Sequence, residues 1–307
     1  MRRCSSPRSA SLARLIPRVC SLLPSATEIV GALGRTGWLV GRSEECDFPA
    51  DVGDLPVVTA SRVDTATLSS RDIDTAVRDA VLSGRALYAV DEALIRELAP
   101  DIVITQDLCH VCAVSGDEVG KITSLDAEVI SLDPRTIADV EGTVLLLGER
   151  LDAAAAAGAV VERMRRTIAA AAEAVAGLPP VPVFVAEWLD PPFAAGHWVP
   201  EMVTLAGGHE VLGRAGGPSF PVTWEDVSAA GPDVVVVAPC GFGAERAAAE
   251  SAGVRFPCRA VAVEADSYYS RPAPRLADGV AQLAHILHPT VAPDPGLPEI
   301  GLEAAVA

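Results

Sequence analysis

Residues 99–112, with the sequence APDIVITQDLCHVC, combine a short apolar run with a polar segment that holds two thiols and an imidazole. The β-branched residues 102–104 are typical of a strand that is buried on both faces of a parallel sheet. The polar half leaves the carboxyl end of that strand, which is where ligands bind in open α/β sheets. The stretch therefore predicts a parallel α/β fold with a binding loop after a central strand.

A similar phrase recurs at residues 231–240, GPDVVVVAPC. Both runs place Pro-Asp before the apolar residues and a cysteine after them. This repetition predicts two similar lobes, over residues 17–135 and 179–289, whose loops face a shared cleft.

Residues 136–178, between the two lobes, have a helical period and are rich in alanine. A helix over residues 152–177 would be about 39 Å long, which suits a rigid spine better than a flexible linker. The predicted fold class is therefore α/β, with two Rossmann-like lobes that contain parallel sheets and are joined by one long helix. We expect residues 1–16 to be a disordered leader and the proline-rich residues 290–307 to be a disordered tail.

Composition limits the partners of this 307-residue chain. The net charge of −17 argues against nucleic acid and anionic membrane surfaces. No apolar run reaches the roughly 18–20 residues of a membrane span, so we do not expect an integral membrane protein. The arginine-rich start lacks the apolar segment of about 7–15 residues found in secretory signals. We therefore expect a cytoplasmic monomer.

Several segments, taken in order, resemble the helical-backbone substrate-binding proteins of ABC importers for iron–siderophores, haem and cobalamin. They are residues 21–28, SLLPSATE; the DFP turn at 47–49; LAPDIVI at 98–104; WEDV at 224–227; and the second Pro-Asp at 232–233. The resemblance covers about residues 18–289 and is closest to the cobalamin-binding members. It implies a class III periplasmic-binding-protein-like fold that holds a large planar ligand, cobalamin or a related corrinoid, between lobes with little hinge motion. Sequence alone leaves haem and siderophores open.

The resemblance also implies that the protein docks on an ABC permease through one surface glutamate on each lobe. Glu225 matches the position in the second lobe. In the first lobe the equivalent position is Ala93, and Glu92 lies beside it. We therefore assign Glu92 and Glu225 to docking.

Aromatic residues make up only 4% of the chain, and most of them fall in loops at the predicted carboxyl ends of strands. Aromatic walls suit the apolar face of a corrin or porphyrin, although loop packing would place them there too. Arg271 is suited to ligand carboxylates or to a surface salt bridge. The predicted ligand contacts are Cys46, Asp47, Phe48, Cys109, Trp188, His197, Trp198, Phe242, Tyr268, Tyr269 and Arg271.

Four cysteines, Cys46, Cys109, Cys112 and Cys240, lie in three loops that the predicted fold directs toward one cleft. Cys109 and Cys112 have the two-residue gap of a metal chelate. These thiolates could hold zinc or an iron–sulfur cluster, or one of them could ligate the metal of a tetrapyrrole. The other interpretation is that they are packed, redox-silent thiols.

Motifs for catalysis are absent from the sequence: there is no Gly-x-Ser-x-Gly, no phosphate-binding glycine loop and no His-Glu-x-x-His. We therefore predict a binding protein that is not an enzyme. The alternative is a cytoplasmic relative whose cleft cysteines bind a metal or cluster for cofactor handling or catalysis.

Overall fold

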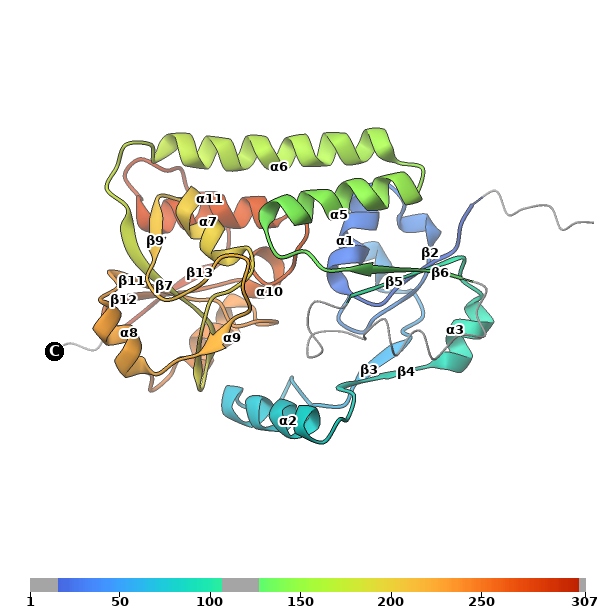
Figure 1. The fold of residues 1–307 in the computed structure, drawn as a ribbon, viewed down its shortest axis with the longest axis horizontal. Helices are drawn as coiled ribbons and strands as arrows, with labels where there is room; N and C mark the ends of the chain where they lie inside the picture. The colour runs from blue at the N-terminus through green and yellow to red at the C-terminus, as the bar shows by residue number, and fades with distance from the viewer. Residues whose placement is uncertain (1–15, 107–126, 304–307) are drawn as a thin grey trace, which may run out of the picture.

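The computed structural model describes residues 16–106 and 127–303, which form two α/β lobes bridged by a helical layer (Figure 1). The first lobe contains a four-stranded sheet, and the second contains a seven-stranded sheet. This arrangement confirms the predicted α/β class with two sheet-bearing lobes.

The sheet of the first lobe is entirely parallel, in the order β2-β1-β5-β6. All five residues of β5 are buried, as expected for a central strand that is covered on both faces. The strands are β1 (Val19–Ser21), β2 (Leu39–Arg42), β5 (Ile102–Gln106) and β6 (Glu128–Leu132).

The sheet of the second lobe has a parallel centre, β7-β11-β12, extended by antiparallel strands at both edges. A further short strand, β9, pairs in parallel with β7. The strands are β7 (Val181–Leu189), β8 (Pro192–Ala194), β9 (Gly208–Glu210), β10 (Phe220–Pro221), β11 (Val234–Val237), β12 (Arg259–Val263) and β13 (Glu299–Leu302).

The repeated Pro-Asp has the same place in both lobes. The backbone N–H of Asp101, just before β5, donates to the carbonyl of Arg18 at 2.8 Å. The N–H of Asp233, just before β11, donates to the carbonyl of Pro182 at 2.9 Å. In each case the bond joins the start of the central strand to its neighbour, so the sequence repeat reflects a structural repeat.

The linker forms two helices instead of one, α5 (Ile137–Arg150) and α6 (Ala154–Ala174). They form a hairpin, and α6 alone runs along both lobes (Figure 1). At the crossing, a Cβ on Gly148 would lie 2.3 Å from the Cβ of Ala157, so only glycine allows this approach. The spine is therefore α6, and α5 packs against it on the side that faces the sheet of the first lobe.

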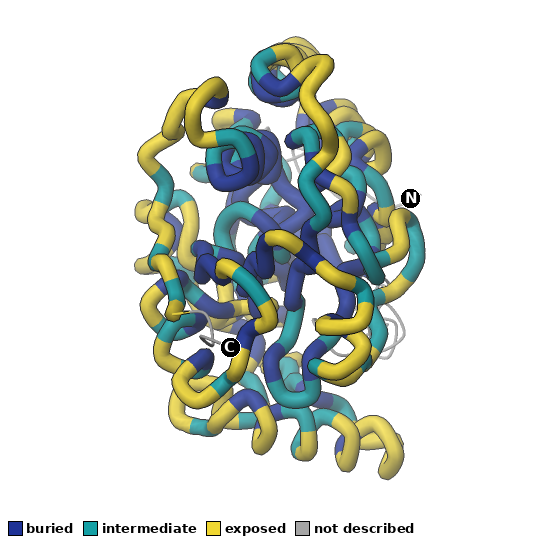
Figure 2. The backbone as a smooth tube through the Cα atoms, turned by 90° about the vertical axis from the view of Figure 1, so that its left-hand side faces the viewer, coloured by how far each residue is buried: buried dark blue, intermediate teal, exposed yellow. Residues whose placement is uncertain are grey.

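One apolar core runs through both lobes. Ile29 of the first lobe, Met164 of α6 and Leu283 of the second lobe belong to the same buried cluster. Figure 2 shows the buried residues gathered in the interior beneath the outer helices. The lobes are therefore joined by packed side chains as well as by chain connectivity.

The remaining helices flank the sheets. Asp91 and Thr223 each stand in the sequence just before a helical pattern, and the structure shows that they cap α3 and α8. The spacing of Ser25 and Glu28 predicts a capping box at the start of α1. This prediction is wrong, because α1 has no side-chain cap and Glu28 accepts from Arg275 instead. The helices are α1 (Pro24–Ala32), α3 (Glu92–Leu98), α7 (Val199–Leu205), α8 (Trp224–Ala230), α9 (Ala244–Glu250), α10 (Ala265–Tyr268) and α11 (Leu276–Leu287).

A separate excursion leaves the first lobe between β3 (Thr59–Ser61) and β4 (Tyr88–Val90), which pair with each other in an antiparallel arrangement. It carries α2 (Ser70–Leu82), whose N-cap is Ser69. In the sequence α2 belongs to the first lobe, but it packs against β7 of the second. Figure 1 shows it at the lower edge of the molecule, between the lobes.

The C-terminal segment differs from the expected disordered tail. Residues 299–302 form β13, which pairs with β12. Ile300 and Leu302 pack against the second apolar cluster, and this packing explains their order despite the proline-rich approach. Within the two described ranges, no helix is long and apolar enough to cross a membrane.

Candidate functional site

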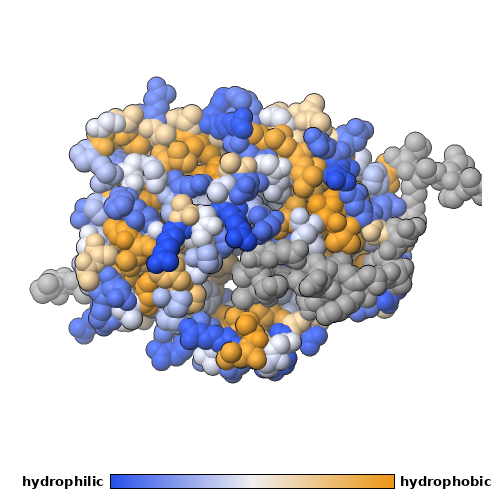
Figure 3. Space-filling view, viewed as in Figure 1, coloured by the Kyte–Doolittle hydropathy of each residue, from blue (hydrophilic) through white to orange (hydrophobic). Residues whose placement is uncertain are grey.

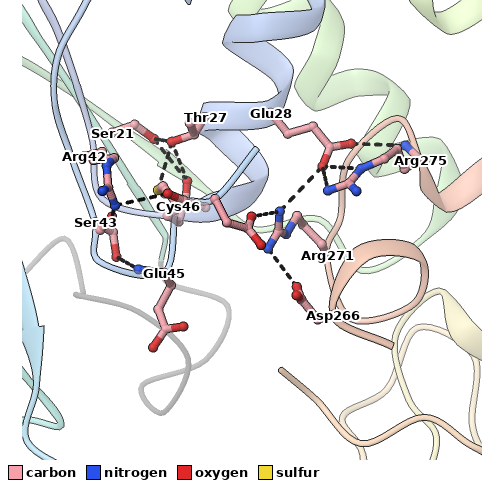
Figure 4. A network of polar contacts seen from close by, with 12 residues as sticks. Ser21, Thr27, Glu28, Arg42, Ser43, Glu45, Cys46, Asp266, Arg271 and Arg275 are labelled. Atoms are coloured by element: carbon pink, nitrogen blue, oxygen red, sulfur yellow. Dashed lines mark hydrogen bonds and ion pairs between the residues drawn. The ribbon is translucent and has the colours of Figure 1, made fainter. Parts of the chain in front are cut away.

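The loops at the carboxyl ends of β2 and β12 meet between the lobes, and we call this contact the interlobe junction. It consists of residues from the first lobe (Glu28, Asp47 and Phe48) and from the second (Asp266, Tyr268, Arg271 and Arg275). Figure 4 shows the guanidinium of Arg271 among carboxylates from both lobes.

Arg271 is the centre of the junction. Its guanidinium donates to Asp47 Oδ1 and Asp266 Oδ1, both at 2.7 Å, and lies 3.8 Å from Glu28 Oε2. Its side chain is 6% exposed and that of Glu28 is 1% exposed. Burial opposes the charge on Arg271, but the three carboxylates more than offset this effect and raise its pKa above the ordinary value. The cation is thus fully engaged by the protein itself.

Arg275 makes a second tie across the junction. Its Nε and Nη2 atoms donate to Glu28 Oε2 at 3.0 and 2.8 Å. Its guanidinium carbon lies 4.0 Å from the ring centroid of Phe48 and 5.5 Å from that of Tyr268. Phe48 remains 42% exposed, so it offers an aromatic surface at the junction that the protein does not cover.

Asp47 and Phe48 are positioned by a tightly bonded loop. Arg42 donates to the carbonyls of Cys46 at 3.1 Å and Gly53 at 2.9 Å. The Thr27 hydroxyl contacts Cys46 Sγ at 3.0 Å, so α1 anchors the same loop. Burial raises the pKa of the Cys46 thiol, although the bond from Thr27 acts in the opposite direction.

The thiols are expected to differ in reactivity. Burial, with a smaller effect of Cys46, raises the pKa of Cys20 to about 12, whereas Cys240 is exposed. Iodoacetamide should therefore label Cys240 at least about tenfold faster than Cys20 or Cys46 in the folded protein. Peptide mass spectrometry would measure this, with urea-unfolded protein as the control for equal reactivity. Equal labelling rates in the folded protein would contradict the buried placement.

The predicted aromatic contacts separate into three groups. Phe48 and Tyr268 lie at the junction, whereas Trp198 and Tyr269 are 4% and 1% exposed and belong to the core. Trp198 Nε1 donates to the carbonyl of Tyr269 at 2.7 Å.

Trp188 and Phe242 form a pair on the second lobe, with ring centroids 5.2 Å apart. Trp188 Nε1 donates to the carbonyl of Ser70, so α2 lies against this pair. Sequence analysis predicted that all these rings lie in loops. It could not indicate which of them are buried in the core.

Two carboxyl groups lie beneath the loops of the second lobe. Glu187 accepts from the N–H of Gly196 at 3.1 Å, and Glu210 accepts from the N–H of Val185 at 3.0 Å. Burial raises the pKa of each to about 7. Nearby, loss of solvent lowers the pKa of His197, and so does Arg135 from the start of the linker. His197 therefore lies where the second lobe meets the helical layer.

The predicted metal ligands are only partly described. Cys109 and Cys112 lie outside the described residues, as does His110. Among residues 16–106 and 127–303, no group of three or more His, Cys, Asp or Glu side chains is arranged to hold a metal ion. Cys46 is buried against Thr27, and Cys240 is exposed. The four-cysteine site stays a prediction.

The two glutamates assigned to docking lie on helices at opposite lateral ends of the molecule, α3 and α8 (Figure 1). Glu225 is exposed in the first turn of α8. Glu92 is exposed in the first turn of α3 and pairs with Arg96 at 2.7 Å. Their docking role stays a prediction.

The junction contains residues that sequence reasoning missed, namely Glu28, Asp266 and Arg275. Glu28 was assigned to a capping box, and its true partner Arg275 is 247 positions away. The available signal was weak: an acidic residue in a helix with otherwise buried neighbours, and an arginine within the apolar start of the last helix.

Comparison with known proteins places the chain in a family. The family model described as "Periplasmic binding protein" matches residues 19–253, which is more than half of the chain. The chain therefore belongs to the periplasmic binding protein family. No curated protein sequence matches the chain.

Solved structures share the fold at low sequence identity. The periplasmic vitamin B12 binding protein of Vibrio cholerae has 21% identity and a TM-score of 0.63, with coverage of 88% of this chain and 96% of that one. A periplasmic heme binding protein from Pseudomonas aeruginosa has 20% identity and a TM-score of 0.67, with coverage of 94% and 96%. A possible iron-binding periplasmic solute-binding protein from Staphylococcus epidermidis has 17% identity and a TM-score of 0.65, with coverage of 89% and 98%.

The family assignment corrects one expectation and supports another. The expected cytoplasmic location is wrong, because the family is one of periplasmic proteins and points to a location outside the cytoplasm. The reasoning failed because it relied on the absence of an apolar segment near residue 1. The family is one of substrate-binding proteins, in agreement with the expectation that the chain is not an enzyme.

Proposed function

We propose that this protein binds a corrinoid, such as cobalamin, between its two lobes and delivers it to an ABC permease. The observation that carries the proposal is the junction, where loops from the carboxyl ends of both sheets meet around the exposed ring of Phe48. Such loops are the usual ligand position in parallel α/β sheets, and exposed rings suit a large planar ligand. Family membership and the titles of the B12- and heme-binding neighbours support this class of ligand.

The charges at the junction favour a corrinoid over haem. Haem carries two propionates, which bind best to free cationic groups. Arg271 and Arg275 are both engaged by protein carboxylates. Nearby, partial loss of solvent and the carboxylates of Glu44, Asp266 and Asp47 raise the pKa of Glu45. These acceptor groups suit the amide side chains of a corrinoid better than they suit additional carboxylates.

The extracytoplasmic location weakens the alternative of a cytoplasmic, cysteine-based metal protein. That alternative also lacks a ligand cluster among the residues whose placement is described. The corrinoid proposal is therefore the better supported of the two.

Calorimetric titration with cyanocobalamin, dicyanocobinamide and haemin tests the proposal. We expect a corrinoid Kd of about 1 µM or tighter and haemin binding at least about tenfold weaker. Phe48→Ala should weaken corrinoid binding about tenfold, because it removes an exposed ring from the junction. Trp38→Ala is the matched control, since Trp38 also lies beneath an arginine, Arg35, but outside the junction.

Two results would count against this function. Absence of binding to all three compounds would overturn the class of ligand. Tighter binding of haemin than of either corrinoid would keep the class but overturn the choice of corrinoid.

A further inference from the structure

The excursion that carries α2 is a closed unit with its own base, and we call residues 62–87 the strap. Its two ends are joined by a bond of 2.8 Å from the N–H of Arg62 to the carbonyl of Leu87. The strands that flank the strap in the sequence, β3 and β4, pair only with each other and lie outside the four-stranded sheet. The strap can therefore move as a unit without disturbing the sheet of its own lobe.

The tip of the strap is bound to the other lobe. Ser70 donates to Glu250 Oε2 through its N–H at 3.0 Å and its hydroxyl at 2.9 Å. The carbonyl of Ser70 accepts from Trp188 Nε1 at 3.1 Å. Ile73 is 5% exposed and lies in the apolar cluster of the second lobe, with Phe242. The strap thus closes the edge of the interlobe region opposite the spine (Figure 1).

The three connections between the lobes differ in strength. The apolar core and the Arg271 network are buried, so their separation would expose a large apolar area or an unpaired charge. The strap instead relies on one buried isoleucine, with Leu68 and Val77 partly buried beside it, and on a few polar ties. One of these ties, Arg71–Asp190, is open to solvent, since the Arg71 side chain is 73% exposed. The strap is therefore the weakest of these three links.

The strap also has a flexible position, Gly84, and a helix end that is exposed to solvent. Gly84, between α2 and β4, has a φ of +64° with open space around it, which suits a bend. On α2, Val81 and Leu82 are 53% and 86% exposed, so this end of the helix makes little contact with either lobe. Figure 3 shows apolar surface at the lower edge of the molecule, where α2 lies.

We propose that the strap is the gate of the interlobe site, an inference that rests on the function proposed above. It swings about β3 and β4, away from Glu250 and Trp188, to admit or release the ligand, and the spine and junction meanwhile keep the lobes at a fixed separation. Opening at the strap replaces the hinge motion that a rigid, shared core prevents.

The first experiment tests strap docking without ligand. Ile73→Ala should increase the rate of tryptic cleavage at Arg71 and Arg78 about tenfold, because cleavage requires the strap to open. Val81→Ala is the matched control on the exposed side of the same helix. The double variant Arg71→Ala/Glu250→Ala removes only polar ties and should increase cleavage at Arg78. Wild-type cleavage rates in both test variants would overturn the docking that the gate requires.

The second experiment measures ligand exchange by stopped-flow absorbance with cyanocobalamin. In Ile73→Ala, the association and dissociation rates should both rise at least about fivefold, and Kd should stay within about threefold, because a gate changes rates without changing the bound state. Unchanged rates in a variant with rapid strap cleavage would overturn the gate but not the binding function. An affinity gain above about tenfold would also overturn it, because the strap would then be a competitor for the site. If the wild-type protein does not bind cyanocobalamin at all, the proposed function is overturned, and the gate with it.

Discussion

Replacing Arg271 with alanine is expected to lower the free energy of unfolding by about 3 kcal/mol, because it leaves buried acceptors without their cation. Glu28 is 1% exposed and keeps Arg275 as a partner. Asp266 and Asp47 are 25% and 58% exposed on their side chains and can recover part of their hydration. The expected loss therefore lies at the lower end of the range for a broken buried ion pair.

Urea unfolding would measure this loss, with Arg165→Ala as the matched control. Arg165 also forms a close pair with a carboxylate, Glu141 at 2.7 Å, but its side chain is 61% exposed. We expect the control to change stability much less than Arg271→Ala does, because solvent screens an exposed pair. Equal losses in the two variants would show that the junction contributes no more than a surface salt bridge.

The second large effect is a loss of stability as the pH rises from about 4.5 to about 7. Burial raises the pKa of Glu187 and Glu210 from 4.5 to about 7, so in this range the folded protein holds protons that the unfolded chain releases. The state that binds more protons is favoured at low pH, and stability therefore falls as the pH rises.

The pKa change of Glu210 corresponds to up to about 3 kcal/mol. The contribution of Glu187 is smaller, because its side chain is partly exposed to solvent. Carboxyls with lowered pKa values, such as Asp139 and Asp226, act below this range and do not cancel the trend.

Urea unfolding at pH 5, 6, 7 and 8 would test this prediction. Glu187→Gln keeps an oxygen to accept from Gly196 but cannot ionise, so it should reduce the pH dependence and raise stability above pH 7 relative to wild type. Glu245→Gln, at an exposed position of α9, should leave the dependence unchanged. A wild-type stability that increases over this pH range would contradict the assignment.

The sheets could be predicted because their strands are local patterns. The apolar runs of β5 and β11, each introduced by Pro-Asp, are recognisable within ten residues and form the centres of their sheets. The caps at Asp91 and Thr223 could be recognised in the same way, because each cap bonds to a backbone N–H only three residues later. Local chemistry therefore fixed the elements and the two-lobed class.

The junction and the strap could not be predicted, because both depend on long-range contacts. Ser70 meets Glu250 across 180 positions, and Glu28 meets Arg275 across 247. Nothing in the sequence near α2 indicates that it binds the opposite lobe. Similarly, Trp198 and Tyr269 follow strands as ligand contacts would, but only the folded packing shows that they fill the core.

The shared apolar core also limits how such a chain can diversify. Because side chains of α1, α6 and α11 interlock in one cluster, a chimaera that exchanges one half for that of a distant relative would bring together surfaces that never adapted to each other. Change in ligand preference is easier at the loops, whose residues contact the core only at their bases. New specificities in this architecture should therefore arise by loop substitution and not by recombination of halves.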